Sequence, residues 1–436
     1  MRCALNGSGA RRTDGHGYVR AGLATVAGLV SVAWLVACGD ATGPVAQAKI
    51  EQLPRALTES ERTLVGAGEG FALDFLREVV RNEEPARNVF VSPLSASMAL
   101  GMALAAAEGD TYEAMRGALR LGDLSRDEIG TSWASLMALL TTLDPHVRVE
   151  IGNSVWLRTG FVPESAYVAG VRRDFDARIA TLDFDDPAAA DTINAWVADA
   201  TEGLIDGIVE PPIDPLMMAF LINAIYFQGD WTVPFDPADT RPGDFRREDG
   251  TTVQAPFMVL PDSEFPFART PGYVAVELPY GGEAFAMTVV VPTGDTKLAE
   301  FVAGLDPDAW EALTADLVPV EVMVRLPKFR LEYDTELKDA LRALGMGPAF
   351  DPGLADFSRL HRDALLMGLH ISEVKQKAFV EVDEKGTRAA AVTAVGVRAV
   401  SMPPVLSADR PFLFAIRERL SGTLLFTGLV FDPTLK

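Results

Sequence analysis

Cysteine and histidine are too scarce in this sequence to build a disulfide framework or a metal centre. The only two cysteines, Cys3 and Cys38, lie in the first tenth of the 436-residue chain, so no disulfide can form within the remainder. The chain has four histidines, none of them in the short spacing of paired metal ligands: His16, His146, His361 and His370. The sequence therefore predicts no metal site.

The motifs that position catalytic groups are missing as well. The chain contains no Gly-x-Ser-x-Gly elbow, no phosphate-binding loop and no His-Glu-x-x-His pair. Residues 66–70, Gly-Ala-Gly-Glu-Gly, are too irregular for a dinucleotide-binding turn and indicate the entry to a helix. His361 and His370, with Asp363 between them, lack the local signature of a catalytic triad. We expect a protein that is not an enzyme and has no cofactor.

Basic residues are few relative to acidic ones. The chain has 39 Lys and Arg against 61 Asp and Glu, a formal net charge of -22. Nucleic acid is therefore excluded as a partner, because phosphate contacts need a basic face. Hydrophobic residues make up 48% of the chain and charged residues 23%, which is typical of a globular protein rather than a disordered one.

The N-terminus has the layout of a bacterial secretory signal. Several arginines precede an apolar run, Ala21–Ala37, which ends in Leu35-Val36-Ala37-Cys38. These four residues resemble the lipoprotein signal box, in which the cysteine becomes the lipid-modified first residue of the mature chain. Ordinary cleavage nearby and a retained anchor are the alternatives.

This layout predicts how the chain is divided. We expect a lipoprotein signal peptide over residues 1–37, a lipid on Cys38, a flexible tether over 38–55 and a single domain over 56–436. The protein would lie outside the cytoplasm, either anchored to the cell envelope or secreted. It would contact a membrane only through the lipid.

Helical patterns dominate the first half of the chain and strand patterns the second. Apolar spacing, with Ser92 as an N-cap and Pro93 at the first helical position, predicts helices over 71–81, 93–108, 111–119, 133–140 and 188–200. Strands are predicted over 148–157, 217–227, 273–278, 286–291, 320–326, 378–382, 412–417 and 424–431. Because the strands do not alternate regularly with helices, the predicted fold class is α+β.

One segment near the C-terminus, Val382–Pro404, reads VDEKGTRAAAVTAVGVRAVSMPP. Its small residues from Arg388 to Val395 lack a 3.6-residue apolar stripe, and valine and threonine weaken the case for a helix. Taken alone, the segment is equally consistent with an exposed Ala-rich linker, so its interpretation depends on the rest of the chain.

Several other stretches occur in a characteristic order between about Phe71 and Pro433. They are residues 88–95 (NVFVSPLS), 223–231 (NAIYFQGDW) followed by Pro234-Phe235, 326–329 (LPKF), 377–387 (KAFVEVDEKGT), 410–414 (RPFLF) and 428–430 (GLV). Together they resemble the serpin family, serine-protease inhibitors that trap their targets by a conformational change. The resemblance covers essentially the whole expected mature chain.

The resemblance implies a single α+β domain with three β-sheets, eight or nine helices and an exposed reactive loop. The Pro403-Pro404 pair and the ten-residue step from Ser401 to Pro411-Phe412 set the register of that loop. They place the cleaved bond between Val400 and Ser401. The loop then has 17 residues from Glu384 to Val400, the length found in inhibitory members.

In this register the loop begins with a hinge and continues with the part that inserts. The hinge contains Glu384, Gly386 and Thr387, and the inserting part is Arg388, Ala389, Ala390, Ala391, Val392 and Thr393. To become a middle strand of a formed sheet, the loop must turn alternate side chains toward the core. The inward positions hold small residues: Thr387, Ala389, Ala391 and Thr393. Insertion therefore places no large or charged side chain in the core. Arg388 faces outward.

Two further clusters follow from the resemblance. Ser92, Ser95, Asn223 and Gln376 match a polar cluster, the shutter, beneath the sheet where its strands part. The family commonly has His where this chain has Gln376, so less pH sensitivity is expected. Trp231, Lys328 and Glu384 match the breach, the point of loop entry, with an ion pair expected between Lys328 and Glu384.

Val400 suits a protease with a small apolar pocket, so an elastase-like target is expected first. A trypsin-like target follows if the register shifts by two to Arg398, and subtilisin-like enzymes are also candidates. Residues 124–140 hold only Arg126 as a basic residue, so no heparin dependence is expected, and the protein should be a monomer. The alternatives are a non-inhibitory serpin that binds or stores, and a solute-binding lipoprotein, which would need alternating βαβ halves.

Overall fold

The fold of residues 49–387 and 403–435 is described by a computed structural model. Contacts divide the chain into residues 1–45 and 46–436, and every described residue belongs to the second unit. Its helices are α1 (Glu59–Asn82), α2 (Pro93–Ala106), α3 (Gly109–Ala118), α4 (Arg126–Thr142), α5 (Ser165–Phe175), α6 (Ala188–Ala200), α7 (Leu298–Ala303), α8 (Pro307–Ala315), and the four-residue α9 (Lys338–Leu341) and α10 (Ala364–Met367). Eight of these described helices are longer than one turn, within the expected eight or nine.

Side-chain caps fix where the N-terminal helices start. Thr58 and Glu61 form a reciprocal capping box at the start of α1, and Ser125 and Glu128 form one at the start of α4. The hydroxyl of Ser92 accepts a hydrogen bond from the amide of Ser95 at the start of α2, as the sequence predicts. Helices α1 and α4 begin well before the predicted residues 71 and 133, because these capping boxes extend them.

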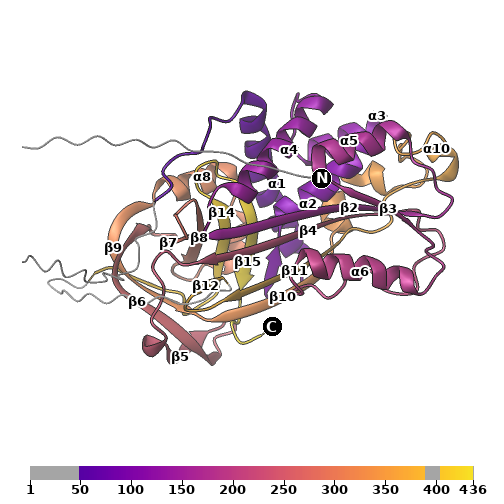
Figure 1. Ribbon diagram of the computed structural model, residues 1–436. Coiled ribbons are helices and arrows are strands. Elements are labelled where there is room, and N and C mark those ends of the chain that lie inside the picture. The colour runs from indigo at the N-terminus through magenta and orange to yellow at the C-terminus, as the bar shows by residue number, and fades with distance from the viewer. Residues whose placement is uncertain (1–48, 388–402, 436) are drawn as a thin grey trace, which may run out of the picture. The chain divides into compact units, whose positions relative to one another are not determined.

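A six-stranded sheet lies across the unit, with helices on both faces (Figure 1). Its strand order is β10 (Phe329–Glu336), β11 (Lys375–Val382), β12 (Gly386–Thr387), β4 (Ala219–Asp230), β2 (Val147–Arg158) and β3 (Arg178–Leu182). Helix α6 covers one face, which we call the outer face, where Ile193 and Val197 pack with Trp156 and Ile222. Helix α2 lies on the opposite, inner face. Of the described neighbours in this sheet, β2 and β3 pair in parallel and the others pair antiparallel.

The other strands form a hydrogen-bonded network that bends at β6 (Thr252–Arg269). Its residues 267–269 pair with β7 (Tyr273–Tyr280), residues 257–267 pair with β9 (Val318–Pro327), and residues 252–257 pair with β5 (Arg241–Arg246). The remaining order is β1 (Val89–Val91), β15 (Leu424–Val430), β14 (Phe412–Glu418), β8 (Phe285–Pro292), β7 (Tyr273–Tyr280), β6, β9 (Val318–Pro327) and β13 (Val405–Ser407), with β5 (Arg241–Arg246) beside β6. The described strands thus make one separate sheet and two parts that share β6.

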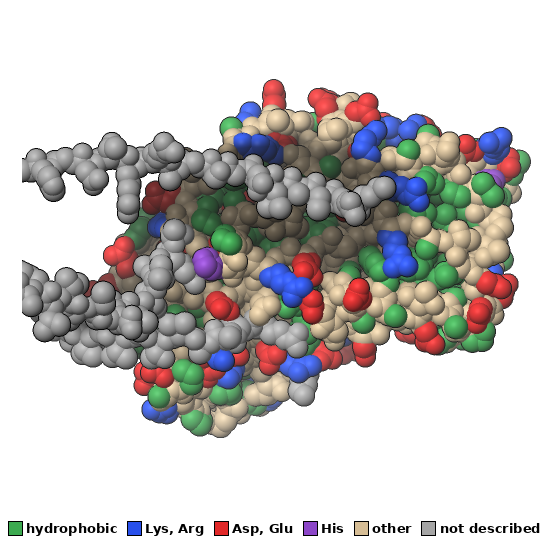
Figure 2. Space-filling view, in the orientation of Figure 1, with side chains coloured by type: hydrophobic (Ala, Val, Ile, Leu, Met, Phe, Trp, Pro, Cys, Tyr) green, Lys and Arg blue, Asp and Glu red, His purple; other side chains and the backbone are tan. Residues whose placement is uncertain are grey.

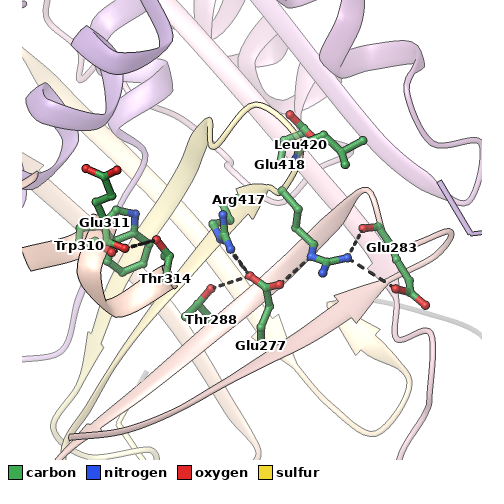
Figure 3. Close-up of polar contacts among 10 residues, drawn as sticks. Glu277, Glu283, Thr288, Trp310, Glu311, Thr314, Arg417, Glu418 and Leu420 are labelled. Carbon is green, nitrogen blue, oxygen red and sulfur yellow. Dashed lines mark hydrogen bonds and ion pairs between the residues drawn. The ribbon is translucent and has the colours of Figure 1, made fainter. Parts of the chain in front are cut away.

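A buried carboxylate links β7 to β14 across β8 in this network. Glu277 is 2% exposed and accepts hydrogen bonds from Arg417, at 3.0 Å from its Nε, and from Thr288 (Figure 3). Arg419 Nε lies 2.6 Å from the second oxygen of Glu277, and Arg419 also donates to the backbone oxygen of Glu283 at 2.9 Å. Because the charge is paired on both oxygens, its burial is tolerated and the turn after β7 is held in place.

The described chain contacts the domain from its first residue. Ile50 donates a backbone hydrogen bond to Gly282 at 2.7 Å, and Lys49 lies 3.1 Å from the carboxylate of Glu283. Ile50, Leu53 and Leu57 pack against the core. Within residues 49–387 and 403–435, none of the helices combines the length and the apolar character that crossing a bilayer requires.

Candidate functional site

The six-stranded sheet is open between β4 and β11, except at one end. There the two residues of β12 lie between them, with Gly386 opposite Asp230, and Thr387 opposite both Gly229 and Val382. Beyond Thr387 the two strands make no described ladder with each other, and a cavity of about 550 Å³ is lined by β4, β11 and α2. We call this space between β4 and β11 the slot.

The burial of side chains on the inner face of β4 is consistent with a gap between β4 and β11. Leu221, Asn223 and Ile225 point toward the core, because they alternate with the α6-facing residues, yet each remains only half-buried. Core side chains in this position normally pack against a neighbouring strand. The sheet therefore has room for one more strand beside β4, whose backbone could pair with that strand.

The predicted polar cluster lies at the floor of the slot. Gln376 accepts a hydrogen bond from the amide of Ser92 at 3.0 Å and donates one to its backbone oxygen at 2.8 Å. Ser92 also donates to the backbone oxygen of Leu425 at 2.8 Å, and Ser95 to that of Asn223 at 3.4 Å. The structure thus brings together the four residues that the resemblance selected, and Gln376 fills both hydrogen-bonding roles toward the Ser92 backbone.

A fifth residue, Asn153 of β2, belongs to this cluster. Its side-chain oxygen accepts from the amide nitrogen of Asn223 at 2.8 Å, and its own nitrogen donates to the backbone oxygen of Phe175 at 2.8 Å. Asn153 was not predicted from the sequence, although an asparagine at an inward position of a strand was a usable signal. The other atom of the Asn223 amide, Oδ1, is buried and has no hydrogen-bond partner within residues 49–387 and 403–435. Such an acceptor is costly to leave unpaired.

At the closed end of the slot, Glu384 is clamped from two sides. Lys328 Nζ lies 2.7 Å from one carboxylate oxygen of Glu384, and the hydroxyl of Thr240 donates to the other at 2.8 Å. Its backbone oxygen accepts from the amide of Phe235 at 2.9 Å. The Lys328–Glu384 pair is the one the sequence suggested, whereas Thr240 carried no signal because it is 144 residues away in the chain.

Trp231 supports the same turn through the backbone rather than through Glu384. Its indole nitrogen donates to the backbone oxygen of Asp383 at 2.9 Å, and its amide to that of Lys385 at 2.8 Å. Its ring stacks on Tyr280 with centroids 4.4 Å apart, and the Tyr280 hydroxyl lies 2.7 Å from that of Thr387. Tyr280 is a hinge contact that sequence reasoning missed.

Gly386 is required where it lies. Its φ is +155°, and a Cβ there would come within 2.1 Å of the backbone oxygen of Gly229. The chain approaches β4 so closely that only glycine fits, and this approach delivers Thr387 into the sheet, where it is 5% exposed.

The Glu384 clamp predicts a pH dependence. Burial opposes ionisation of Glu384, but the hydrogen bonds from Lys328 and Thr240 outweigh it and hold the pKa below its usual 4.5. With a lowered folded-state pKa, the clamp stabilises above the unfolded-state pKa and is lost as pH falls through the folded one. At pH 7 we expect Glu384→Gln to unfold more easily in urea, by about 1–2 kcal/mol. A difference unchanged between pH 7 and pH 3 would contradict this origin.

Several predicted residues lie outside the described residues. They are Cys38, Arg388, Ala389, Ala390, Ala391, Val392, Thr393, Val400 and Ser401. In the described ranges 49–387 and 403–435, no three or more His, Cys, Asp or Glu side chains are grouped so as to hold a metal ion.

Comparison with known proteins agrees with this geometry. Residues 67–433 match the family model described as serpin (serine protease inhibitor). The chain is 32% identical over 374 residues to glia-derived nexin of Rattus norvegicus, covering 84% of this chain and 92% of the nexin.

Solved structures resemble the described fold over most of their length. One is native protease nexin-1 with heparin, at 30% identity and a TM-score of 0.76, covering 86% of this chain and all of the nexin chain. Another is human thyroxine-binding globulin complexed with thyroxine, at 27% identity and a TM-score of 0.78, with the same coverage.

Proposed function

Because the chain belongs to the serpin family, whose members are mostly protease inhibitors, we propose that it traps serine proteases by inserting its own cleaved loop into the slot. The observation that carries the proposal is the half-open sheet: β12 occupies the first two positions between β4 and β11, and the cavity of about 550 Å³ continues from it. The occupant we assign to that cavity is the segment that follows Thr387.

The register of β12 predicts where each following residue would lie after insertion. If that register continued along both neighbours, Ala389 would lie beside Phe227 and Val380, Ala391 beside Ile225 and Ala378, and Thr393 beside Asn223 and Gln376. Inward side chains of alanine size suit a slot between packed strands. Thr393 would bring a hydroxyl donor to Asn223, whose Oδ1 is buried and has no partner in the part of the chain that the structure describes. Insertion would therefore satisfy the polar group that the open slot leaves without a partner.

The protease would carry out the bond cleavage, and the rate of loop insertion would be set by this chain. The serine oxygen of the protease would bond to the carbonyl carbon of Val400, and the peptide bond to Ser401 would break, its amine leaving with a proton. The 17 residues from Glu384 to Val400 extend over roughly 55 Å as a strand at about 3.3 Å per residue. Insertion before hydrolysis would carry the acylated protease that far and distort its active site.

Val400 before the cleaved bond supports an elastase-like target, with trypsin- and subtilisin-like enzymes next. Protease nexin-1 was solved with heparin, whereas helix α4 of this chain offers no basic face, since its only basic residue is Arg126. Basic side chains on the face in Figure 2 are scattered among acidic ones. We therefore propose a monomeric inhibitor that does not depend on heparin, held outside the cytoplasm by a lipid on Cys38 or secreted.

A protease panel tests the proposal. Incubation with elastase-, trypsin- and subtilisin-like enzymes should give a covalent complex that survives boiling in detergent, with stoichiometric loss of protease activity. Cleavage near Val400 with every protease left active would instead favour a non-inhibitory binding or storage role. The similarity to thyroxine-binding globulin, solved with a small ligand, makes that alternative worth measuring.

A further inference from the structure

The connection between α6 and β4 passes over the outer side of the slot. Its residues Ile205, Ile208 and Val209 line the same cavity as β4 and β11. We call residues 203–214 the crossing segment, because it contacts α6 on one side of the slot and β11 on the other. Any strand that enters between β4 and β11 has to form beneath it.

On the α6 side the crossing segment is firmly attached. Asn194 of α6 accepts hydrogen bonds from the amides of Ile208 and Val209, both at 2.9 Å, and donates to the backbone oxygen of Val209 at 2.8 Å. Ile205, Val209 and Ile213 are buried in the apolar cluster that α6 forms with the sheet. This side is held by packing and by a neutral amide whose oxygen accepts two hydrogen bonds and whose nitrogen donates one, and salt screens neither.

On the β11 side the described polar attachments are charges. Lys377 Nζ lies 2.8 Å from Asp206, and Lys375 Nζ lies 3.9 Å from Glu210 and 3.6 Å from Glu373 just before β11. The carboxylate side chains of Asp206 and Glu210 are 90% and 86% exposed, whereas both lysines are largely covered. Exposed ion pairs of this kind are weak and are screened by salt.

We propose that the pairs Lys377–Asp206 and Lys375–Glu210 are a latch across the slot, and that their release sets how fast the sheet opens for an inserting strand. The inference rests on the proposed insertion and adds the residues that control its speed. The asymmetry supports it: when β4 and β11 separate, the crossing segment stays on α6 and leaves β11. If the latch opens more slowly, water has longer to hydrolyse the acyl-enzyme before the loop inserts. These ion pairs would therefore influence what fraction of protease molecules is trapped and what fraction is released active.

The test compares Asp206→Asn with a matched control, Asp199→Asn, which removes an exposed carboxylate of α6 for which no ion pair is described. The uncleaved proteins are warmed without protease, and conversion to the urea-resistant, inserted form is timed by tryptophan fluorescence. Asp206→Asn should convert about two- to fivefold faster than wild type, and the control at the wild-type rate. The double variant Asp206→Lys with Lys377→Glu should return toward the wild-type rate.

Salt provides the readout that a merely structural role would not move. One molar NaCl should speed conversion of the wild type about as much as Asp206→Asn does, and should have little further effect on the variant combined with Glu210→Gln. Equal rates for Asp206→Asn and Asp199→Asn, or an equal salt effect on both, would overturn the latch.

The two proposals fail differently. If no protease forms a covalent complex, the inhibitory function is wrong, while the warming experiment still reports on the latch. If complexes form but Asp206→Asn converts no faster than wild type, only the latch is wrong.

Discussion

Thr387→Arg is expected to change the protein from an inhibitor of its target protease into a substrate. Thr387 is 5% exposed, and its hydroxyl meets that of Tyr280 inside the sheet. A guanidinium there would be buried without an anionic partner, or would hold the hinge out of the sheet. A penalty of about 3 kcal/mol in the insertion step slows it by roughly two orders of magnitude. Hydrolysis of the acyl-enzyme would then finish first.

The measurement is the number of inhibitor molecules consumed for each protease inactivated. We expect about one for wild type, more than about ten for Thr387→Arg, and the wild-type value for Thr387→Ser, which keeps the hydroxyl. The cleaved chain should accumulate with the protease active. If Thr387→Arg traps protease as efficiently as wild type, trapping does not require residue 387 to stay in the sheet, and the proposed role of β12 is wrong.

Glu384→Lys is expected to polymerise on warming at least about tenfold faster than wild type. The substitution replaces a clamped carboxylate by an ammonium group facing Lys328, whose Nζ lies 2.7 Å from the present carboxylate. Repulsion between two part-buried like charges, together with the lost Thr240 hydrogen bond, would free the 383–385 turn and open the slot at its entry. An open slot can accept a strand from a second molecule instead of the chain's own loop.

Glu381→Lys is the matched control, since Glu381 lies three residues earlier on the outer side of β11 and makes no described ion pair. Its polymerisation rate, followed by native gel electrophoresis at a fixed temperature, should stay near that of wild type. If Glu384→Lys polymerises no faster than this control, the contacts of Glu384 with Lys328 and Thr240 do not keep the slot closed at its entry.

The sequence predicted elements best where local signals agree with the fold. Helix α6 has the predicted bounds, Ala188–Ala200, and Ser92 caps α2 as expected. The long strand β6 went unrecognised because Pro256, Pro261 and Pro266 suggest a loop. In the structure Pro256 and Pro266 face prolines of β5 and β9, so neither member of the pair needs a ladder amide, and Pro261 lies at a register irregularity.

Strand β10 could have been found, because Phe329, Leu331 and Tyr333 alternate with charged residues, and all three are buried.

The contacts that complete the site could not be read from local patterns. Thr240 and Tyr280 reach Glu384 and Thr387 only because distant strands meet at the slot entry, and neither residue lies in a recognisable motif. The same applies to the Lys377–Asp206 pair, which joins residues 171 apart in the chain. The family resemblance predicted the residues of the two clusters, whereas their partners became known only from the tertiary structure.

The thermal stability of the loop-cleaved protein tests the central claim most directly, because it needs no knowledge of the natural target. The chain is nicked within residues 388–402 by a protease that it does not trap, and its unfolding temperature is compared with that of the intact protein. We predict a rise of tens of degrees, since a completed strand fills the slot and satisfies Asn223. An unfolding temperature that cleavage leaves unchanged would show that the gap between β4 and β11 does not receive the loop.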